Sequence, residues 1–216
     1  MGMRPAALFD LDGTLINSEA RSLVVWGMLL DSHGVEHDEN VLRGFMGRRG
    51  PDVLGEMLPG YDMHALMVEI NSYLALPGLP EVEVVPGAAE FVHAVAASGA
   101  PTALVTSARR WWAEDRLRWL GVYDLVQTIV TAEDVTAGKP DPEAYLTAAA
   151  RLGVEPADCV VFEDSLAGIA AARAAGMTCV GLATTHHPGE LAHADLVVAD
   201  LTGVKWPITG WSGPPA

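Results

Sequence analysis

The chain has 216 residues, half of them hydrophobic and 6% aromatic, and it carries 28 acidic residues against 13 Lys and Arg, a formal charge of −15. This length suits one sizeable domain, or one domain with a smaller insert, and the acidic balance argues against binding to nucleic acids or to anionic membrane surfaces. A small anionic substrate is still compatible with this charge. Salt screens charges beyond roughly 8 Å, so the charges close to the binding site, and not the net charge, determine whether an anion binds.

The first predicted element is a short buried strand that runs straight into two acids. Ala6 to Phe9 are apolar, and Asp10 and Asp12 follow them in the sequence AALFDLDGTLINSEA, residues 6–20. Because side chains alternate along a strand, both carboxylates point to the same side at its end. Like charges this close repel, so a cation, a shared proton or a reaction has to compensate for the repulsion.

Residues 17–85 differ from the rest of the chain and predict a small helical insert. They contain few strand signals and four apolar stretches with helical character: ARSLVVWGMLLDSHG, ENVLRGFMG, DVLGEML and HALMVEINSYLAL. The Pro- and Gly-rich segment 77–87 predicts a return linker. We therefore expect a core formed by residues 1–16 and 86–216, with residues 17–85 as a helical cap.

From residue 86 onwards, predicted helices alternate with short apolar strands. Helices are predicted over 86–99, 110–121, 141–153 and 165–176, and strands over 100–107, 158–164, 178–185 and, weakly, 194–200. Residues 127–134 are predicted to form a strand followed by a loop. The strongest helix has Asp141 as its expected N-cap and Pro142 in its first turn. This alternation predicts βαβ units and an α/β fold, with a three-layer, Rossmann-like core and a mainly parallel sheet covered by helices on both faces.

Polar side chains stand where the predicted strands end, and open parallel sheets bind ligands at that edge. These residues are Asp10, Asp12, Thr106, Ser107, Glu163 and Asp164, and Lys139 lies in the loop TAGKPDPE before the strongest helix. Taken singly, each has a simpler interpretation, because Lys139 suits a solvated loop and the hydroxyl and acidic residues suit helix caps. The joint pattern favours a shared site.

The segments DLDGT, LVTS, GKPDP and VFEDS, in this order, resemble the four motifs of the haloacid dehalogenase superfamily of phosphohydrolases. The resemblance covers essentially the whole chain, including a helical cap between the first and second motifs. It implies that Asp10 is a nucleophile that forms an aspartyl-phosphate, and that Asp12 is the general acid and base. Lys139 would neutralise Asp10 and the phosphoryl oxygens, while the Thr106 hydroxyl and the Ser107 N–H would bind the phosphoryl group.

The same resemblance implies a divalent cation. Mg²⁺ prefers oxygen ligands, and the side chains of Asp10 and Asp164 would hold it with Glu163 close by. The family pattern adds the backbone carbonyl of Asp12 as a further ligand. The cation would offset the repulsion between a phosphate dianion and these carboxylates.

The expected substrate is a small phosphorylated metabolite, because several stretches resemble sugar- and polyol-phosphate phosphatases of this superfamily. Arg48 and Arg49, on a Gly-flanked loop of the cap, are the specificity candidates, together with Glu19 just after the first motif. A relative, the β-phosphoglucomutase type, carries a His on the first cap helix, where Ser22 stands here. We therefore favour net hydrolysis, with a mutase as the alternative and a catalytically silent binding protein of the same fold as a third hypothesis.

The remaining features predict no further site. Cys159 and Cys179 lie in apolar runs and suit buried free thiols. Trp111 and Trp112 suit helix packing more than a platform for a ligand, and the three histidines at 186, 187 and 193 suit a loop or surface role. The N-terminus lacks signal-peptide character and no run of 18 apolar residues occurs. We expect a cytoplasmic monomer or weak dimer without nucleic-acid or membrane partners, and a poorly ordered tail after Lys205.

Overall fold

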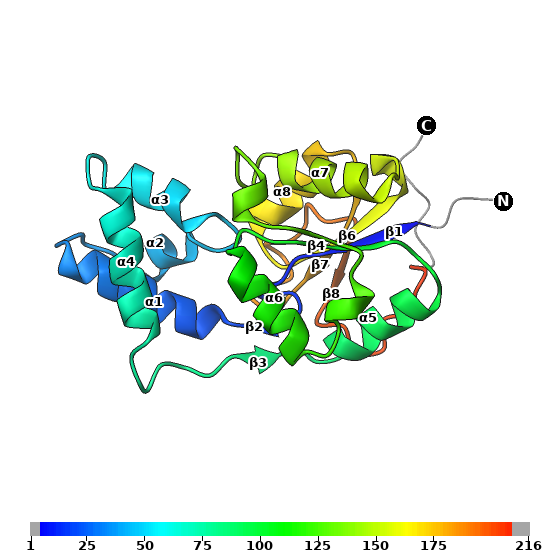
Figure 1. The fold of residues 1–216 in the computed structure, drawn as a ribbon, viewed down its shortest axis with the longest axis horizontal. Coiled ribbons are helices and arrows are strands. Elements are labelled where there is room, and N and C mark those ends of the chain that lie inside the picture. Colours follow the sequence, from blue (N-terminus) through cyan, green and yellow to red (C-terminus); the bar gives the residue numbers. More distant parts are fainter. Residues whose placement is uncertain (1–4, 209–216) are drawn as a thin grey trace.

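A six-stranded parallel sheet, in the order β5-β4-β1-β6-β7-β8, forms the centre of the larger part of the molecule (Figure 1). This computed structural model of the protein describes residues 5–208. The strands of the sheet are β1 (Ala6–Phe9), β4 (Thr102–Val105), β5 (Thr128–Val130), β6 (Cys159–Glu163), β7 (Thr178–Leu182) and β8 (Leu196–Val198). The α/β fold with a parallel sheet that the sequence predicts is therefore confirmed.

Helices cover both faces of this sheet (Figure 1). They are α5 (Ala88–Ala97) and α6 (Arg110–Trp119) on one face, and α7 (Glu143–Leu152) and α8 (Leu166–Ala174) on the other. Side chains of β1 alternate between the two apolar clusters, with Ala7 and Phe9 packed beside α5 and α6 and with Ala6 and Leu8 packed beside α7 and α8. Burial on both faces explains why β1 reads as a continuous apolar run rather than as an alternating one.

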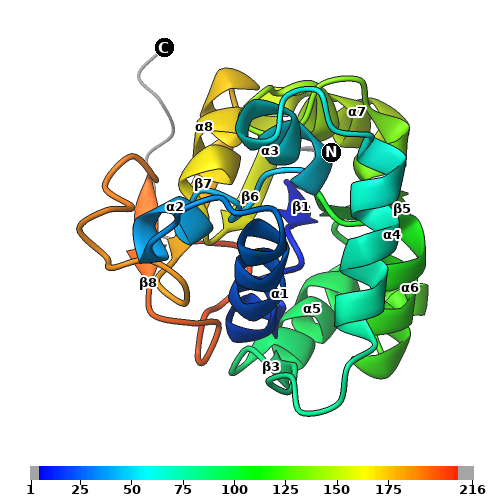
Figure 2. The same ribbon diagram turned by 90° about the vertical axis from the view of Figure 1, so that its left-hand side faces the viewer.

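Four helices form the smaller part of the molecule, which lies in front of the sheet in Figure 2. They are α1 (Glu19–Ser32), α2 (Glu39–Arg43), α3 (Gly50–Met57) and α4 (Met63–Leu74). These helices surround their own apolar cluster, which includes Leu29, Leu54 and Leu66. An antiparallel pair of short strands, β2 (Ile16–Asn17) and β3 (Glu83–Val84), joins this helical part to the rest of the chain.

Several local expectations need correction. The segment 77–87, expected as a plain linker, contains β3, whose two residues were too few to give a strand signal. The helix expected to start with Asp141 as its N-cap has Pro142 in that position and begins at Glu143, while Asp141 accepts a hydrogen bond from the Glu143 N–H at 2.9 Å. The segment expected as a loop after β5 contains the short 3-10 helix η2 (Ala132–Asp134). Two more short 3-10 helices are η1 (Tyr123–Leu125) and η3 (Pro156–Asp158).

The C-terminal tail is only partly as expected. Trp206 packs against Phe162, with ring centroids 6.3 Å apart, so the start of the tail is anchored on the core. The expectation of poor order for residues 209–216 lies outside the described residues. Cys159 and Cys179 are buried and free, as predicted. Within the described residues, none of the helices combines the length and the apolar character needed to cross a membrane.

Candidate active site

The site is assembled at the carboxyl ends of three neighbouring strands. Phe9, the last residue of β1, pairs with Leu104 of β4 on one side and with Phe162 of β6 on the other. Asp10 follows β1, Glu163 ends β6, and Asp10 donates its backbone N–H to the Phe162 carbonyl at 3.0 Å. Strand order therefore brings together residues that are more than 150 positions apart in the sequence.

Three buried carboxylates and one buried ammonium group form the centre of the site. Oxygen atoms of Asp10, Glu163 and Asp164 lie within 4.8 Å of one another. Lys139 Nζ donates to Asp10 Oδ1 and to Glu163 Oε1, each at 2.6 Å, and to the Val105 carbonyl at 3.1 Å. The Lys139 side chain is only 1% exposed. The loop lysine that would normally be solvated is thus an internal counter-ion.

Further donors fix the orientation of Glu163, which ends β6, and of Asp164, which follows it. Tyr145 donates its hydroxyl to Glu163 Oε1 at 3.0 Å, and Ser165 donates both its N–H and its hydroxyl to Glu163 Oε2 at 2.9 Å. Thr14 and Thr185 donate to the two oxygens of Asp164, at 3.0 and 2.6 Å. These bonds hold both carboxylates in single orientations before any ligand binds.

Gly13 allows the loop after β1 to approach Asp164. Its φ angle is +90°, and a Cβ atom placed there would lie 2.1 Å from Asp164 Oδ2. Any other residue would be strained and would also collide with the carboxylate. The Gly in DLDGT is therefore required by the geometry of the carboxylate cluster.

The electrostatics of the cluster favour a bound cation. Burial raises the pKa of Asp10 well above its ordinary value, Lys139 acts in the opposite direction, and the neighbouring acids raise this pKa further. Burial and Glu163 likewise raise the pKa of Asp164, against hydrogen bonds from Thr185 and Thr14. Burial acts to lower the pKa of Lys139, but the facing carboxylates outweigh it and keep the group charged. One lysine cannot balance three carboxylates, and an all-oxygen set of donors suits a hard cation such as Mg²⁺.

Asp12 is not one of the three clustered carboxylates and has its own pair of donors. Ser18 donates its hydroxyl to Asp12 Oδ1 at 2.6 Å, and Trp112 donates its indole N–H to the same oxygen at 3.1 Å. Burial raises the pKa of Asp12, and the hydrogen bonds from Ser18 and Trp112 partly counteract this effect. The two acids of the Asp-x-Asp pair therefore occupy different environments.

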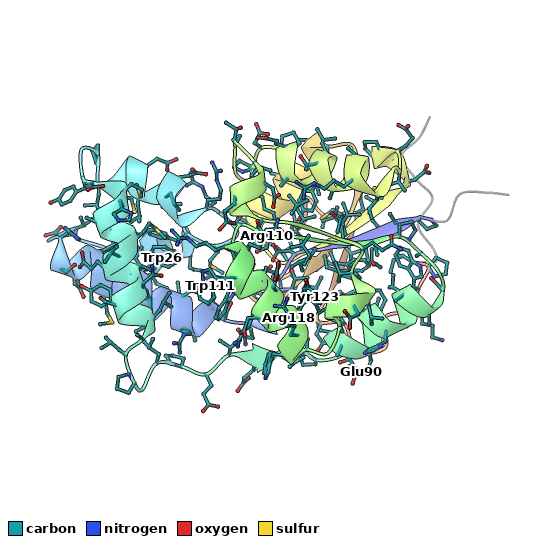
Figure 3. All side chains as sticks on the ribbon, viewed as in Figure 1. Trp26, Glu90, Arg110, Trp111, Arg118 and Tyr123 are labelled. Atoms are coloured by element: carbon teal, nitrogen blue, oxygen red, sulfur yellow. The ribbon has the colours of Figure 1, made fainter. Side chains whose placement is uncertain are left out.

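A cleft of about 420 Å³ opens above the site, between the four-helix part and the sheet. Asp10, Asp12, Thr106 and Ser107 are part of its lining, and most of its remaining surface is apolar. The aromatic residues of the lining are Trp26, Phe45, Trp111 and Trp112. Figure 3 shows Trp26 in the four-helix part and Trp111 at the end of α6 that is nearest to it.

Glu19 lines the cleft, and its role in substrate binding stays a prediction. Burial raises its pKa to about 7; Arg43 acts to lower this pKa and Asp12 acts to raise it. The Thr106 side chain is buried and accepts a hydrogen bond from the Ala108 N–H at 3.0 Å. The Ser107 hydroxyl donates to the Gly47 carbonyl at 2.8 Å, so it ties the helical part to the sheet.

The two adjacent arginines have different environments. Arg48 lines the cleft and forms a two-pronged pair with Glu56. Arg49 is paired with Asp52 and donates to the carbonyls of Val135 and Thr136, at 3.0 and 2.7 Å. Arg49 thus joins the helical part to the loop before α7.

Several residues of the site could not be predicted from the sequence. Helix packing was favoured over a ligand platform for Trp111 and Trp112, but the Trp112 N–H donates to Asp12, and Trp111 is 55% exposed and lines the cleft. Tyr145 and Thr185 gave no sequence signal, because their contacts with Glu163 and Asp164 join distant elements. The position of Trp112 in the first turn of the helix after β4 was the one available hint, since that turn faces the ligand edge of the sheet.

Comparisons with known proteins agree with this geometry. A family model described as haloacid dehalogenase-like hydrolase matches residues 5–176. The chain is 46% identical over 211 residues to validoxylamine A 7′-phosphate phosphatase of Streptomyces hygroscopicus subsp. limoneus, which covers 96% of this chain and 99% of that protein. It is 33% identical over 179 residues to fructose-1-phosphate phosphatase YqaB of Escherichia coli, covering 80% of this chain and 93% of that protein. Among solved structures, β-phosphoglucomutase from Clostridium difficile has a TM-score of 0.82 at 25% identity, over 94% of both chains.

Proposed function

The chain belongs to the haloacid dehalogenase-like hydrolases and is a phosphatase, and we propose that it hydrolyses the phosphomonoester of a small sugar or polyol through an aspartyl-phosphate formed on Asp10. One observation carries this proposal: Asp10 is buried, its Oδ1 accepts a hydrogen bond from Lys139 Nζ at 2.6 Å, and it lines the cleft together with Asp12. A carboxylate nucleophile splits a difficult hydrolysis into two easier displacements.

In the first step, an oxygen of Asp10 forms a bond to phosphorus while the bond between phosphorus and the leaving oxygen breaks. Asp12 gives its proton to that oxygen, which departs as an alcohol. In the second step, Asp12 takes a proton from water, the water oxygen attacks phosphorus, and the bond to Asp10 breaks. Inorganic phosphate leaves, and both carboxyl groups return to their starting states.

The surrounding residues would stabilise the transferring phosphoryl group. Lys139 would neutralise Asp10 and a phosphoryl oxygen, while the Thr106 hydroxyl and the Ser107 N–H would donate to the other oxygens. Asp10, Asp164 and the Asp12 carbonyl would hold Mg²⁺ with Glu163 beside it, and the bound cation would offset repulsions of about 4 kcal/mol per like-charge contact at 4 Å.

The cleft supports a ring-bearing leaving group. The exposed surface of its lining is mostly apolar and includes Trp26 of α1 and Trp111 of α6 (Figure 3). Polar side chains also line it, among them Glu19, Arg48 and Asn71. Aromatic faces suit the apolar faces of sugar and polyol rings, and polar groups at the edge select hydroxyl positions. The 46% identity to a validoxylamine A 7′-phosphate phosphatase makes validoxylamine A 7′-phosphate the first compound to test.

A phosphosugar mutase is the second candidate, supported by the structural likeness to β-phosphoglucomutase. Ser22 lines the cleft from α1, at the position where the mutase type carries a histidine. A serine hydroxyl does not titrate near neutral pH, so it is a poor substitute for an imidazole in proton transfer. Conversion of β-glucose 1-phosphate to the 6-phosphate without free phosphate would favour this candidate.

The deciding experiment measures phosphate release from a panel of sugar and polyol monophosphates, with and without Mg²⁺. We expect Mg²⁺-dependent release, and loss of it in Asp10→Asn. Asp124→Asn, at an exposed acid of η1, is the matched control and should keep full activity. Full turnover by Asp10→Asn would contradict the proposal, and absence of release by the unaltered protein would favour a silent binding protein.

A further inference from the structure

Trp112 contacts Asp12 although the proposed reaction has no role for it. Its indole N–H and the Ser18 hydroxyl both donate to Oδ1 of Asp12. Oδ2 accepts no hydrogen bond from any described residue, and the described part of the chain has no buried side-chain oxygen without a partner. Oδ2 is therefore open to the cleft that Asp12 lines.

The two donors also decide which oxygen of Asp12 carries a proton. An indole N–H can only donate, whereas the Ser18 hydroxyl can also accept, so a proton on Oδ1 would oppose the Trp112 N–H in particular. The protonated form of Asp12 therefore has its proton on Oδ2, the oxygen that faces the cleft. The same contacts limit rotation of the carboxyl group about its own axis.

The indole ring of Trp112 is itself held firmly. Its body packs against the apolar cluster beneath α5 and α6. The Arg116 guanidinium lies 4.6 Å from the Trp112 ring and 5.3 Å from the Trp119 ring, and Trp111 contacts Trp112 edge-on at 5.8 Å. A packed indole presents its single N–H in one direction.

The two donors come from different parts of the molecule. Ser18 directly precedes α1 and so belongs to the connection with the four-helix part. Trp112 lies in α6, which packs on the sheet that carries Asp10. Trp112 therefore ties Asp12 to the same rigid body as the nucleophile.

We propose that Trp112 is a positioning residue for proton transfer: its N–H fixes Oδ1 of Asp12 so that Oδ2 delivers the proton to the leaving oxygen. This inference rests on the proposed role of Asp12 as the general acid. In the step it governs, the O–H bond on Oδ2 breaks as the bond between phosphorus and the leaving oxygen breaks, and the proton ends on the departing alcohol. The phosphoryl group passes to Asp10.

The test uses two aryl phosphates of similar shape but different need for an acid. p-Nitrophenolate leaves readily without a proton, whereas phenolate needs one, so the ratio of the two kcat/KM values measures the help given by the acid. We expect Trp112→Phe, which keeps a ring for the Arg116 contact, to lower kcat/KM for phenyl phosphate by about 10- to 100-fold. The value for p-nitrophenyl phosphate should fall by about threefold or less, because general acid catalysis adds little to a good leaving group.

Three further variants make the result decisive. Ser18→Ala removes the other donor to Asp12 and should shift the ratio in the same direction. The Ser18 side chain makes no capping hydrogen bond to α1, so this variant does not remove a helix cap. Trp119→Phe alters an exposed indole of the same helix and should leave the ratio unchanged. Asp12→Asn should shift the ratio most, since it removes the acid itself.

A ratio is independent of the fraction of folded enzyme, so a merely structural role of Trp112 would lower both rates and leave the ratio fixed. That result, together with a shifted ratio in Asp12→Asn, would overturn the role of Trp112 and keep the proposed function. An unshifted ratio in Asp12→Asn would instead remove Asp12 as the general acid, and the inference with it.

Discussion

Lys139 is the residue on which the carboxylate cluster depends. Among the described residues it is the cation that contacts both Asp10 and Glu163, and all three side chains are almost fully buried. A buried ion pair adds little net stability compared with apolar residues, but removal of one partner leaves an uncompensated buried charge. The arrangement therefore makes this loop lysine essential to the fold as well as to the proposed chemistry.

Lys139→Met should lower the free energy of unfolding by about 3–5 kcal/mol, because it leaves two buried carboxylates without a counter-ion. Urea denaturation at pH 7 without added metal measures this change. Lys205→Met, at an exposed position, is the matched control and should change stability by about 0.5 kcal/mol or less. Adding Glu163→Gln to the Lys139→Met protein should restore part of the loss, and equal stability of the two lysine variants would refute the interpretation.

At the scale of elements, Asp134 links α6 and α7 at the end of β5. It accepts hydrogen bonds from Arg110 of α6 at 2.6 Å, from Arg151 of α7 at 2.8 Å and from the Thr131 backbone and hydroxyl. Burial acts to raise the pKa of Asp134, but the bonds from Arg151 and Thr131 outweigh it and hold this pKa at about 2. These contacts fix the loop that runs from β5 to Lys139.

Asp134→Asn should lower the free energy of unfolding at pH 7 by about 1–3 kcal/mol, the usual size of a lost charged hydrogen bond. The pKa of Asp134 is lower in the folded state than its ordinary value of 3.8, so its contribution is present above pH 4 and is lost as the pH falls through about 2. Urea denaturation between pH 7 and pH 2 should show the two proteins converging at acidic pH. A constant difference over this range would show that charge is not responsible.

The loop between α2 and α3 places one arginine in the cleft and the other on the sheet part. Arg49 donates to the carbonyls of Val135 and Thr136, whereas Arg48 faces the cleft beside Glu56. Arg49 therefore holds the helical part over the site. Arg48, which lines the cleft, is the candidate of the two for contact with a leaving group.

Arg49→Ala should lower kcat/KM by a similar factor for every substrate, about tenfold, since loss of a charged hydrogen bond is equivalent to about 1.5 kcal/mol or more. Arg48→Ala should alter the ranking of substrates, because it changes the wall of the cleft. Steady-state kinetics on three sugar phosphates of different ring structure would separate the two effects. A changed ranking in Arg49→Ala would mean that this arginine also reads the substrate.

At the scale of the whole molecule, the fold forces acidic groups together in a chain that already carries a formal charge of −15. Oxygens of Asp10, Glu163 and Asp164 lie within 4.8 Å of one another, although Asp10 is far in the sequence from the adjacent pair Glu163 and Asp164. Their repulsion opposes folding, and a bound cation would relieve it. Binding of a cation at this cluster would therefore be linked to the stability of the fold.

Mg²⁺ at about 100 times its dissociation constant should stabilise the protein by about 2.7 kcal/mol, which corresponds to a Tm increase of about 5–10 °C for a chain of this size. Asp164→Asn should abolish this increase and should raise the Tm of the metal-free protein, because it removes one of the repelling charges. Thermal denaturation with Mg²⁺ or with a chelator measures both effects. An equal response of the two proteins to Mg²⁺ would place the metal elsewhere.

Much of the fold could be predicted from local patterns. The alternation of helices and short apolar strands after residue 86 predicts the parallel sheet, and β1, β4 and β6 occur where they were expected. The cysteines are buried as predicted. The boundaries at 16/17 and 85/86 stay a prediction, while β3 was missed because two residues give too weak a periodic signal.

The sequence by itself determined which chemical groups stand at the ends of the strands, because parallel strands share one carboxyl edge and the pattern of each strand is local. It therefore predicted that Asp10, Asp12, Lys139 and Asp164 would serve one site. Only the tertiary structure decided which side chains complete that site. Trp112 reaches Asp12 across 100 positions of sequence, and Arg48 and Arg49 face different partners. Such directions are set by packing between distant elements, which no local pattern encodes.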